Sequence, residues 1–357
     1  MELVQDPKEA KIMIYVGIDV HKKNLQTCVL NKVGDKLAST KIENTPDSVD
    51  GYFRNLQLPA GVALEATHNW GMIYDLLNDL GFEVHICHSK EAKMIGLASV
   101  KTDRVDAYKL ATLLRVGLLP EAYVPAPGER ELRSLVRHRA SLKGVSTRLK
   151  NQIHAILRAN WINSPWSDTF GKSGRVFLGS LAIGENYKIA IASKLAVLDA
   201  LDIQVAIIDN EIQRRAHMDA RAMIITTIPG FGEFRAVMLL AEVVDIKRFG
   251  RAESLVCFTG LNPRENSSGD KVRRGKITKE GSRWLRWIFV EAAQHAIREE
   301  GKIRDLYLRV AAKKGHNRAV VAAARELVVS VYWMLTRMEP YRASGKKLVL
   351  TGNSEVR

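Results

Sequence analysis

The sequence has few cysteines and no long apolar run. Its 3 cysteines are too few and too scattered for a disulfide framework, and Cys87 with the nearby His85 and His88 matches no zinc-binding spacing. No apolar run reaches the roughly 18 residues that a membrane-spanning helix needs. The first residues lack the charged and apolar regions of a signal peptide. We therefore expect a cytoplasmic protein with no membrane partner.

Acidic residues are scarce relative to basic ones. The 357 residues include 54 Lys and Arg against 39 Asp and Glu, which gives a net charge of +15. This balance favours a polyanionic partner, with nucleic acid ahead of a membrane surface. A hydrophobic content of 46% over this length is enough for two or three domains with sizeable cores.

Residues 13–125 alternate between short apolar segments and helical patterns. The expected strands are 13–19, 25–31, 36–42, 60–65 and 82–87, and the expected helices are 46–56, 69–80 and 103–117. Gly34-Asp35 is typical of a hairpin turn between the second and third strands. Hairpin-linked strands followed by strand–helix alternation predict a mixed α/β sheet.

From about residue 129 the pattern becomes helical. Apolar residues recur at every seventh position in two stripes: Leu135, Leu142, Leu149 and Ile156, then Ile191, Leu198, Val205 and Ile212. The stripes predict a helical hairpin or an intermolecular coiled coil, with two amphipathic helices packed on their own domain as the alternative. We expect domains at 1–127, 128–218 and 219–340, and a polar tail at 341–357.

Four carboxylates stand at positions that suit metal binding. Asp19 and Glu65 each end a short apolar run that is typical of a buried strand. Asp103 and Asp106 open an apolar-periodic helix, and their spacing of three puts both on one face. Acids that converge from strand ends and a helix face can hold Mg²⁺ or Mn²⁺, and such a site cuts or joins phosphodiesters.

Each of these acids also has a simpler interpretation. Asp19 can cap a turn, Asp103 can be a helix N-cap, and Glu65 can be a solvated strand end. The spacing alone leaves both interpretations open. Lys101 and Arg104 stand beside the aspartates, where they suit the positioning of a phosphate.

A glycine-rich basic loop is expected at residues 260–281, before a helix with interleaved arginines and tryptophans. Flexible backbone with guanidinium groups suits a phosphate backbone, and a solvated basic loop is the alternative. The expected nucleic-acid-binding residues here are Arg264, Lys271, Arg273, Arg274, Lys276, Arg283 and Arg286. Ser268 is either a nucleophile or a turn residue, and the lack of a sequence-adjacent base favours the turn residue.

Residues 228–232, Ile-Pro-Gly-Phe-Gly, precede an apolar helix and resemble half of a helix–hairpin–helix DNA element. In such an element Gly230 and Gly232 would present backbone N–H groups to a phosphate. A plain glycine-containing turn between two helices is the alternative.

Four segments together resemble, in order, the IS110 family of insertion-sequence transposases, also called DEDD transposases or bridge-RNA-guided recombinases. They are Gly-Ile-Asp-Val-His-Lys at 17–22, Leu-Glu-Ala-Thr at 64–67, Lys-Thr-Asp-Arg-Val-Asp-Ala at 101–107, and the block from 228–232 through 260–281. The resemblance spans about residues 13–300.

The resemblance implies a ribonuclease-H-like (RuvC-like) α/β N-terminal domain whose acidic site is Asp19, Glu65, Asp103 and Asp106. It implies a helical coiled-coil insertion and a mostly α-helical transposase domain in which Ser268 is the nucleophile, with the adjacent Ser267 as its rival. It also implies a structured noncoding guide RNA that pairs with target and donor DNA. A dimer or tetramer would then combine the acids of one protomer with the serine of another.

We therefore expect a DNA recombinase that cleaves and rejoins strands through a phosphoserine intermediate with the help of Mg²⁺. One alternative is a metal-dependent nuclease or Holliday-junction resolvase in which water attacks. The other is a non-catalytic nucleic-acid-binding protein, against which the acidic quartet argues.

Overall fold

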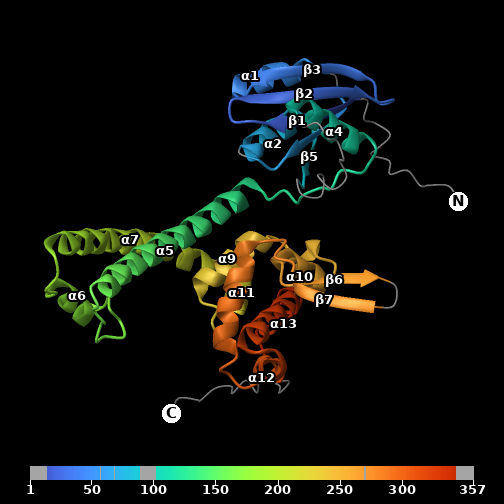
Figure 1. The fold of residues 1–357 in the computed structure, drawn as a ribbon. Helices are drawn as coiled ribbons and strands as arrows, with labels where there is room; N and C mark the ends of the chain where they lie inside the picture. Colours follow the sequence, from blue (N-terminus) through green and yellow to red (C-terminus); the bar gives the residue numbers. More distant parts are fainter. Residues whose placement is uncertain (1–13, 57, 68, 89–101, 269–270, 343–357) are drawn as a thin grey trace, which may run out of the picture. The chain divides into compact units, whose positions relative to one another are not determined.

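The computed structural model describes residues 14–56, 58–67, 69–88, 102–268 and 271–342 (Figure 1). The chain divides into two compact units, Met1–Pro127 and Gly128–Arg357. The first unit is built on a sheet and the second is mostly helical. The finer division of the second unit at residue 218 stays a prediction.

The first unit contains a five-stranded mixed sheet in the order β3-β2-β1-β4-β5. Its strands are β1 (Ile14–Val20), β2 (Asn24–Asn31), β3 (Lys36–Glu43), β4 (Ala60–Glu65) and β5 (Glu83–Cys87). β1, β2 and β3 are antiparallel neighbours, whereas β4 runs parallel to β1 and β5 runs parallel to β4. The prediction of a mixed α/β sheet is confirmed.

Helices cover both faces of this sheet. On one face α1 (Pro46–Arg54) and α2 (Trp70–Asp79) bury Phe53 and Leu77 in a core with the inward side chains of β1 and β4. On the other face α4 (Asp103–Arg115) packs Ala107 and Ala111 against Cys28 of β2. The small side chains of α4 bring its backbone close to the strands.

Gly17 is the point of closest approach between α4 and β1. A Cβ atom at this position would lie 2.0 Å from the carbonyl oxygen of Ala107 and 2.5 Å from the amide nitrogen of Ala111. No side chain fits in that space, so only glycine allows α4 to lie where it does. Gly17 comes two residues before Asp19, on the same face of the strand.

The second unit combines ten helical segments in its described residues with one β-hairpin. The long helices α5 (Pro127–Ala159) and α7 (Glu185–Met218) flank α6 (Lys172–Gly179). The remaining elements are α8 (Ala220–Thr226), α9 (Glu233–Val243), η2 (Ile246–Arg248), α10 (Ala252–Thr259), β6 (Pro263–Ser268), β7 (Lys271–Ile277), α11 (Arg283–Ala296), α12 (Lys302–Lys314) and α13 (His316–Arg337).

The two long helices are antiparallel, because Arg139 pairs with Asp209 while Lys143, further along α5, pairs with Asp202. On α7 the predicted stripe of Ile191, Leu198, Val205 and Ile212 is buried. On α5 the buried positions are Val136, Ala140, Ser146, Ile153 and Leu157, whereas all four residues of the predicted stripe are only half-buried. The intermolecular coiled coil stays a prediction.

Glu242 of α9 joins α5 to the rest of the second unit. Its side chain is 2% exposed and accepts hydrogen bonds from Arg137 Nε at 2.7 Å and Arg137 Nη2 at 2.9 Å. Ser282, the N-cap of α11, donates a third hydrogen bond to the same carboxylate at 3.0 Å. A buried carboxylate needs such donors, and breaking one pair of this kind typically costs about 3–5 kcal/mol.

Within the described residues, one helix, α13, is long and apolar enough to cross a membrane, judged by its length and composition alone. It has an ordinary place in the core, where Ala323, Leu327 and Val331 are fully buried. Its apolar length is therefore explained by packing against α10, α11 and α12.

Replacing Gly17 with alanine should push α4 away from β1. We expect Gly17→Ala to destabilise the first unit by about 1–3 kcal/mol, as overpacking typically does. The measurement is urea unfolding monitored by a probe within residues 1–127. Gly51→Ala is the matched control, because a Cβ there meets nothing within 4 Å and Gly51 lies inside helix α1. In that control the free energy of unfolding should rise by about 0.5–1 kcal/mol, because alanine favours a helix more than glycine does. An unchanged stability for Gly17→Ala would contradict the close contact.

Candidate acidic site and basic hairpin

Two of the predicted acids stand at the same edge of the sheet. Asp19 lies near the carboxyl end of β1 and Glu65 ends β4. These parallel strands pair Ile18 with Leu64. Asp19 and Glu65 are the next residues on the two strands, so they lie side by side at this edge. Glu65 comes two residues after Ala63, which packs against Leu110 of α4. Alternation along the strands therefore places Asp19 and Glu65 on the face that α4 covers.

The other two acids lie in the first turn of α4. Thr102 is the N-cap, since its hydroxyl accepts a hydrogen bond from the amide of Val105 at 3.3 Å. The alternative that Asp103 is the N-cap is therefore wrong, and Asp103 is the first helical residue. Negative side chains in the first turn are stabilised by the helix dipole, which favours two acids at this point.

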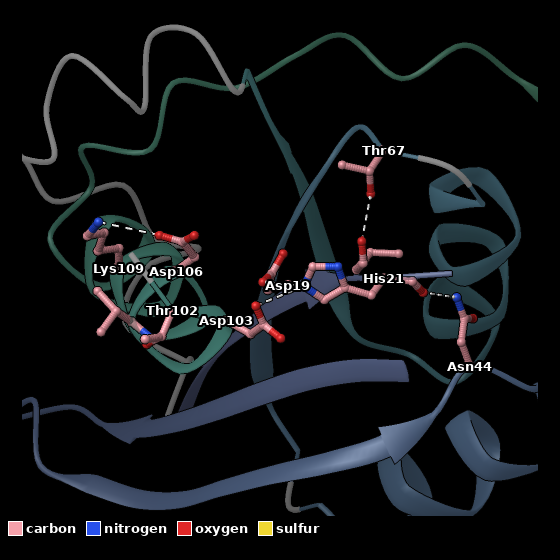
Figure 2. A network of polar contacts seen from close by, with 10 residues as sticks. Asp19, His21, Asn44, Thr67, Thr102, Asp103, Asp106 and Lys109 are labelled. Carbon is pink, nitrogen blue, oxygen red and sulfur yellow. Dashed lines mark hydrogen bonds and ion pairs between the residues drawn. The ribbon is translucent and has the colours of Figure 1, made fainter. Parts of the chain in front are cut away.

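His21 joins the strand to the helix, as Figure 2 shows. Its Nε2 lies 3.1 Å from Asp19 Oδ2 and 3.1 Å from Asp103 Oδ1. The backbone of His21 is held by Asn44, whose side-chain amide donates to the His21 carbonyl at 2.8 Å. Sequence reasoning gave His21 no role, although it lies within the motif at 17–22. Its position two residues after Asp19, directly beyond the end of β1, was the available signal.

The electrostatics of the site centre on Asp19. Burial raises the pKa of its carboxyl above the ordinary value, and the negative charges of Asp103 and Asp106 raise it further, while His21 opposes them. A carboxylate that gathers like charges around it is poised to bind a cation. The half-buried Asp106 is also 3.4 Å from Lys109 Nζ.

Two of the four predicted acids, together with His21, form a group that could hold a divalent cation. The ligand atoms of Asp19, His21 and Asp103 all lie within 4.8 Å of one another. That spacing suits an ion whose ligands stand about 2.0–2.6 Å from it. In the part of the chain that the structure describes, Glu65 and Asp106 lie outside this group of three. Both are half-buried on the same side of the sheet, while the side chain of Arg104 is exposed and that of Lys101 is outside the described residues.

The expected basic loop is instead a β-hairpin, so this expectation was wrong. β6 and β7 are antiparallel, with Ser268 opposite Lys271. Main-chain pairing does not depend on side-chain identity, so a hairpin can form here without the alternating apolar pattern of a strand. Ser268 is therefore the last residue of β6. The side chains of Ser267, Ser268, Lys271, Arg273 and Arg274 are outside the described ones.

The basic residues near this hairpin have different environments and contacts. Arg264, Lys276 and Arg283 are exposed, and Arg283 lies over the ring of Trp284 at 4.7 Å. Arg286 instead holds the base of the hairpin. Its Nη1 donates to the carbonyls of Thr259 at 3.1 Å and Lys279 at 3.3 Å.

The two glycines of the turn between α8 and α9 also differ. Gly230 has φ +86°, and a Cβ there would lie 2.8 Å from the Cβ of His295. It therefore permits close packing against α11, and its carbonyl accepts a hydrogen bond from Arg235. Gly232 is the N-cap of α9, and a Cβ there would meet nothing within 4 Å.

The raised pKa of Asp19 leads to a pH-dependent prediction. Protons compete with a metal ion, so Mn²⁺ affinity should be full above that pKa and fall as the pH drops through it. Without metal, it is the folding stability that depends on pH, and this dependence has the opposite sign. The folded chain holds this proton more tightly than the unfolded chain, so stability is lost as the pH rises through the raised pKa.

Asp19→Asn should therefore weaken Mn²⁺ binding by at least about tenfold, or about 1.4 kcal/mol, while leaving the metal-free protein as stable or more stable at neutral pH. Calorimetric titration with Mn²⁺ and urea unfolding are the measurements. Asp47→Asn is the control, because this exposed acid of α1 lies outside the cluster. Unchanged Mn²⁺ affinity in Asp19→Asn would exclude Asp19 as a ligand.

Comparisons with known proteins place this arrangement in a family. Residues 16–162 match a model for DEDD transposases of the IS110 type, and residues 222–308 match the model described as the transposase IS116/IS110/IS902 family. The transposase for insertion sequence element IS1111A of Coxiella burnetii is 26% identical over 94% of this chain and 92% of its own length. A probable family 20 transposase of Pseudomonas aeruginosa is 23% identical over 92% of this chain and 98% of its own. The first model covers the acidic site and the second covers the basic hairpin, and so the chain belongs to the IS110 family of insertion-sequence transposases, which are enzymes that act on DNA.

Proposed function

We propose that this transposase cleaves and rejoins DNA through a covalent bond between Ser268 and a strand end. The observation that carries the phosphodiester chemistry is the convergence of Asp19 and Asp103, 84 positions apart in the sequence, on the single nitrogen of His21, and the family resemblance of residues 260–281 supports the serine. The negative charges of Asp103 and Asp106 oppose ionisation of Asp19, so the gathering of these acids suits a bound cation. A phosphodiester-processing site needs such acids. We also propose that the sheet is ribonuclease-H-like, which its strand order and strand-end acids support.

The acids would hold a divalent cation, Mg²⁺ or Mn²⁺, with Glu65 and Asp106 completing the set around Asp19 and Asp103. When bound, such an ion polarises a phosphate and favours ionisation of a nearby hydroxyl. The residues of this chain orient the carboxylates. Thr102 fixes the start of α4, and Gly17 sets how close that helix lies to β1.

In the chemical step the Oγ of Ser268 bonds to phosphorus and the bond from phosphorus to one deoxyribose oxygen breaks. The serine proton departs and the leaving oxygen gains one. Attack by a deoxyribose hydroxyl on the phosphoserine reverses the step, so rejoining needs no ATP. The basic residues of the hairpin near Ser268 would stabilise charge on the phosphate oxygens, and the exposed Arg264 and Lys276 at its base would bind phosphates further along the strand.

Ser268→Ala should abolish any covalent protein–DNA species, because no oxygen remains to attack phosphorus, whereas Ser267→Ala should retain it. Denaturing gels of labelled DNA test this through a slow, protease-sensitive band. Ser267→Ala is the matched control, one residue away on the same strand. Cleavage by Ser268→Ala that leaves only free DNA ends would favour the rival in which water attacks. Metal-independent DNA binding with no cleavage would favour the non-catalytic rival.

We also propose a homo-oligomer, a dimer or tetramer, through the long helices. α7 is apolar on a second side, where Ile189, Ile203 and Ile207 are 60%, 62% and 58% exposed. Spacings of 14 and 4 residues place these positions along one outer stripe, as in a coiled-coil seam.

The double variant Ile203→Glu/Ile207→Glu should therefore shift the protein towards monomer in light scattering, since charges in a packed seam repel and lose hydration. Gln204→Glu adds a charge to the same helix outside the stripe and should leave the oligomer intact. Monomer alone for the unmodified protein, with and without nucleic acid, would refute the oligomer.

A structured noncoding guide RNA is proposed as the further partner. The net charge of +15 supports a polyanion, and the family resemblance selects RNA. Ribonuclease treatment should abolish recombination by the purified protein, and RNA transcribed from the noncoding DNA beside the gene should restore it. Affinity should also fall steeply with salt. Recombination that survives ribonuclease with no RNA added back would remove RNA from the mechanism. Cytoplasmic location is proposed with these partners.

A further inference from the structure

A cavity of about 620 Å³ lies at the base of the serine-bearing hairpin, within the second unit. α10 contributes Val256 and Cys257 to its lining, the chain at the start of β6 contributes Asn262 and Pro263, and α13 contributes Arg325. Its volume is in the range of roughly 300–1,000 Å³ that is usual for small-molecule sites. Of the residues that line it, only Arg264 has a role in the proposed function described above.

The lining combines apolar surface with hydrogen-bonding groups. Val256 and Pro263 supply the apolar part, and Asn262 and Glu253 supply the polar part. The side-chain oxygen of Asn262 accepts from the hydroxyl of Thr278 at 2.8 Å, which fixes the amide. Among the described residues its N–H₂ group has no acceptor. A nucleobase has the matching character, since it offers apolar faces and an edge of donors and acceptors.

The charges favour a nucleotide over a bare phosphate. Arg264 and the half-buried Arg325 form no ion pair with any residue that the structure describes. A partly buried guanidinium is stabilised by an anionic ligand, and phosphate suits it well. Glu253 and Glu265 also line the cavity, so a ligand with negative charge on all sides would be repelled. A neutral base with one phosphate gives the arginines an anionic partner and keeps further negative charge away from the two glutamates.

The cavity lies close to Ser268 along the strand. Arg264 and Ser268 are four residues apart on β6, a distance of about 13 Å at 3.3 Å per residue. Stacked nucleotides advance about 3.4 Å each along a strand, so this corresponds to about four of them. A strand joined to Ser268 would therefore reach the cavity within a few nucleotides.

We propose that this cavity holds one unstacked nucleotide of the DNA strand that Ser268 attacks, with Arg325 on its phosphate. The inference rests on the proposed function, because it takes the strand from the serine reaction. Unstacking a base costs a few kcal/mol and fixes the register of the strand against the nucleophile. Arg325 is thus a positioning residue for the scissile phosphate.

Cys257 supplies a direct probe of occupancy in the full-length protein. It is the exposed cysteine of the three, and Cys28 and Cys87 are buried. We expect a short single-stranded DNA at saturating concentration to slow alkylation of Cys257 by about tenfold, or about 1.4 kcal/mol. Mass spectrometry of the Cys257 peptide gives the rate. An oligonucleotide of the same length and charge made of abasic residues should give no protection.

Arg325→Gln should remove the protection while overall DNA binding, followed by fluorescence anisotropy, changes by less than about threefold, because one contact of many is lost. Arg318→Gln is the matched control, since it removes an exposed arginine from the same helix, and it should keep the protection.

Equal protection by intact and abasic DNA would overturn the nucleobase assignment, and so would unprotected Cys257 on DNA-bound protein. Stronger protection by RNA of the same sequence would overturn the assignment to the cleaved DNA strand. A protein that binds no DNA in the anisotropy measurement would instead refute the proposed function, and the cavity assignment with it.

Discussion

The acidic site depends on one close contact, the approach of α4 to the backbone of β1 at Gly17. A side chain at that position would overlap the carbonyl of Ala107, so the contact requires a glycine facing small residues of the helix. Because Asp19 is two residues beyond Gly17 and Asp103 is four residues before Ala107, the packing that joins helix to strand also sets the spacing of the acids. Core packing and the geometry of the acidic site are therefore one constraint in the first unit.

Much of the first unit could be predicted because its signals are local. Short apolar runs bounded by turn residues gave β1, β2 and β4 to within a residue or two, and a strand that is buried on both faces has few other interpretations. The turn at Gly34 could be predicted because its backbone has φ +107°, a conformation that glycine adopts readily and other residues rarely adopt. The start of α4 was predicted at the right place, but the cap is Thr102 because a hydroxyl reaches the third amide of the helix.

The second unit shows where sequence patterns stop being informative. The hairpin was expected to be a loop because its side chains carry no alternating pattern, and ladder hydrogen bonds are independent of side-chain identity. Arg286 looks like a phosphate ligand in the sequence, yet it binds two backbone carbonyls, a role set by the turn that Gly260 makes beside it. His21 was missed since its partner Asp103 is distant in the sequence, and such contacts depend on the fold as a whole.

The joint at Glu242 has a mechanical consequence. From Arg137 to Ala159 the helix α5 continues for 22 residues, a length of about 33 Å at 1.5 Å per residue. A rotation of about 5° at the joint therefore displaces the far end by about 3 Å over that length. Ser282, bonded to the same carboxylate, begins the helix that follows the serine hairpin. The Glu242 carboxylate thus connects the long helix α5 directly to the N-cap residue of α11, the helix that follows the hairpin.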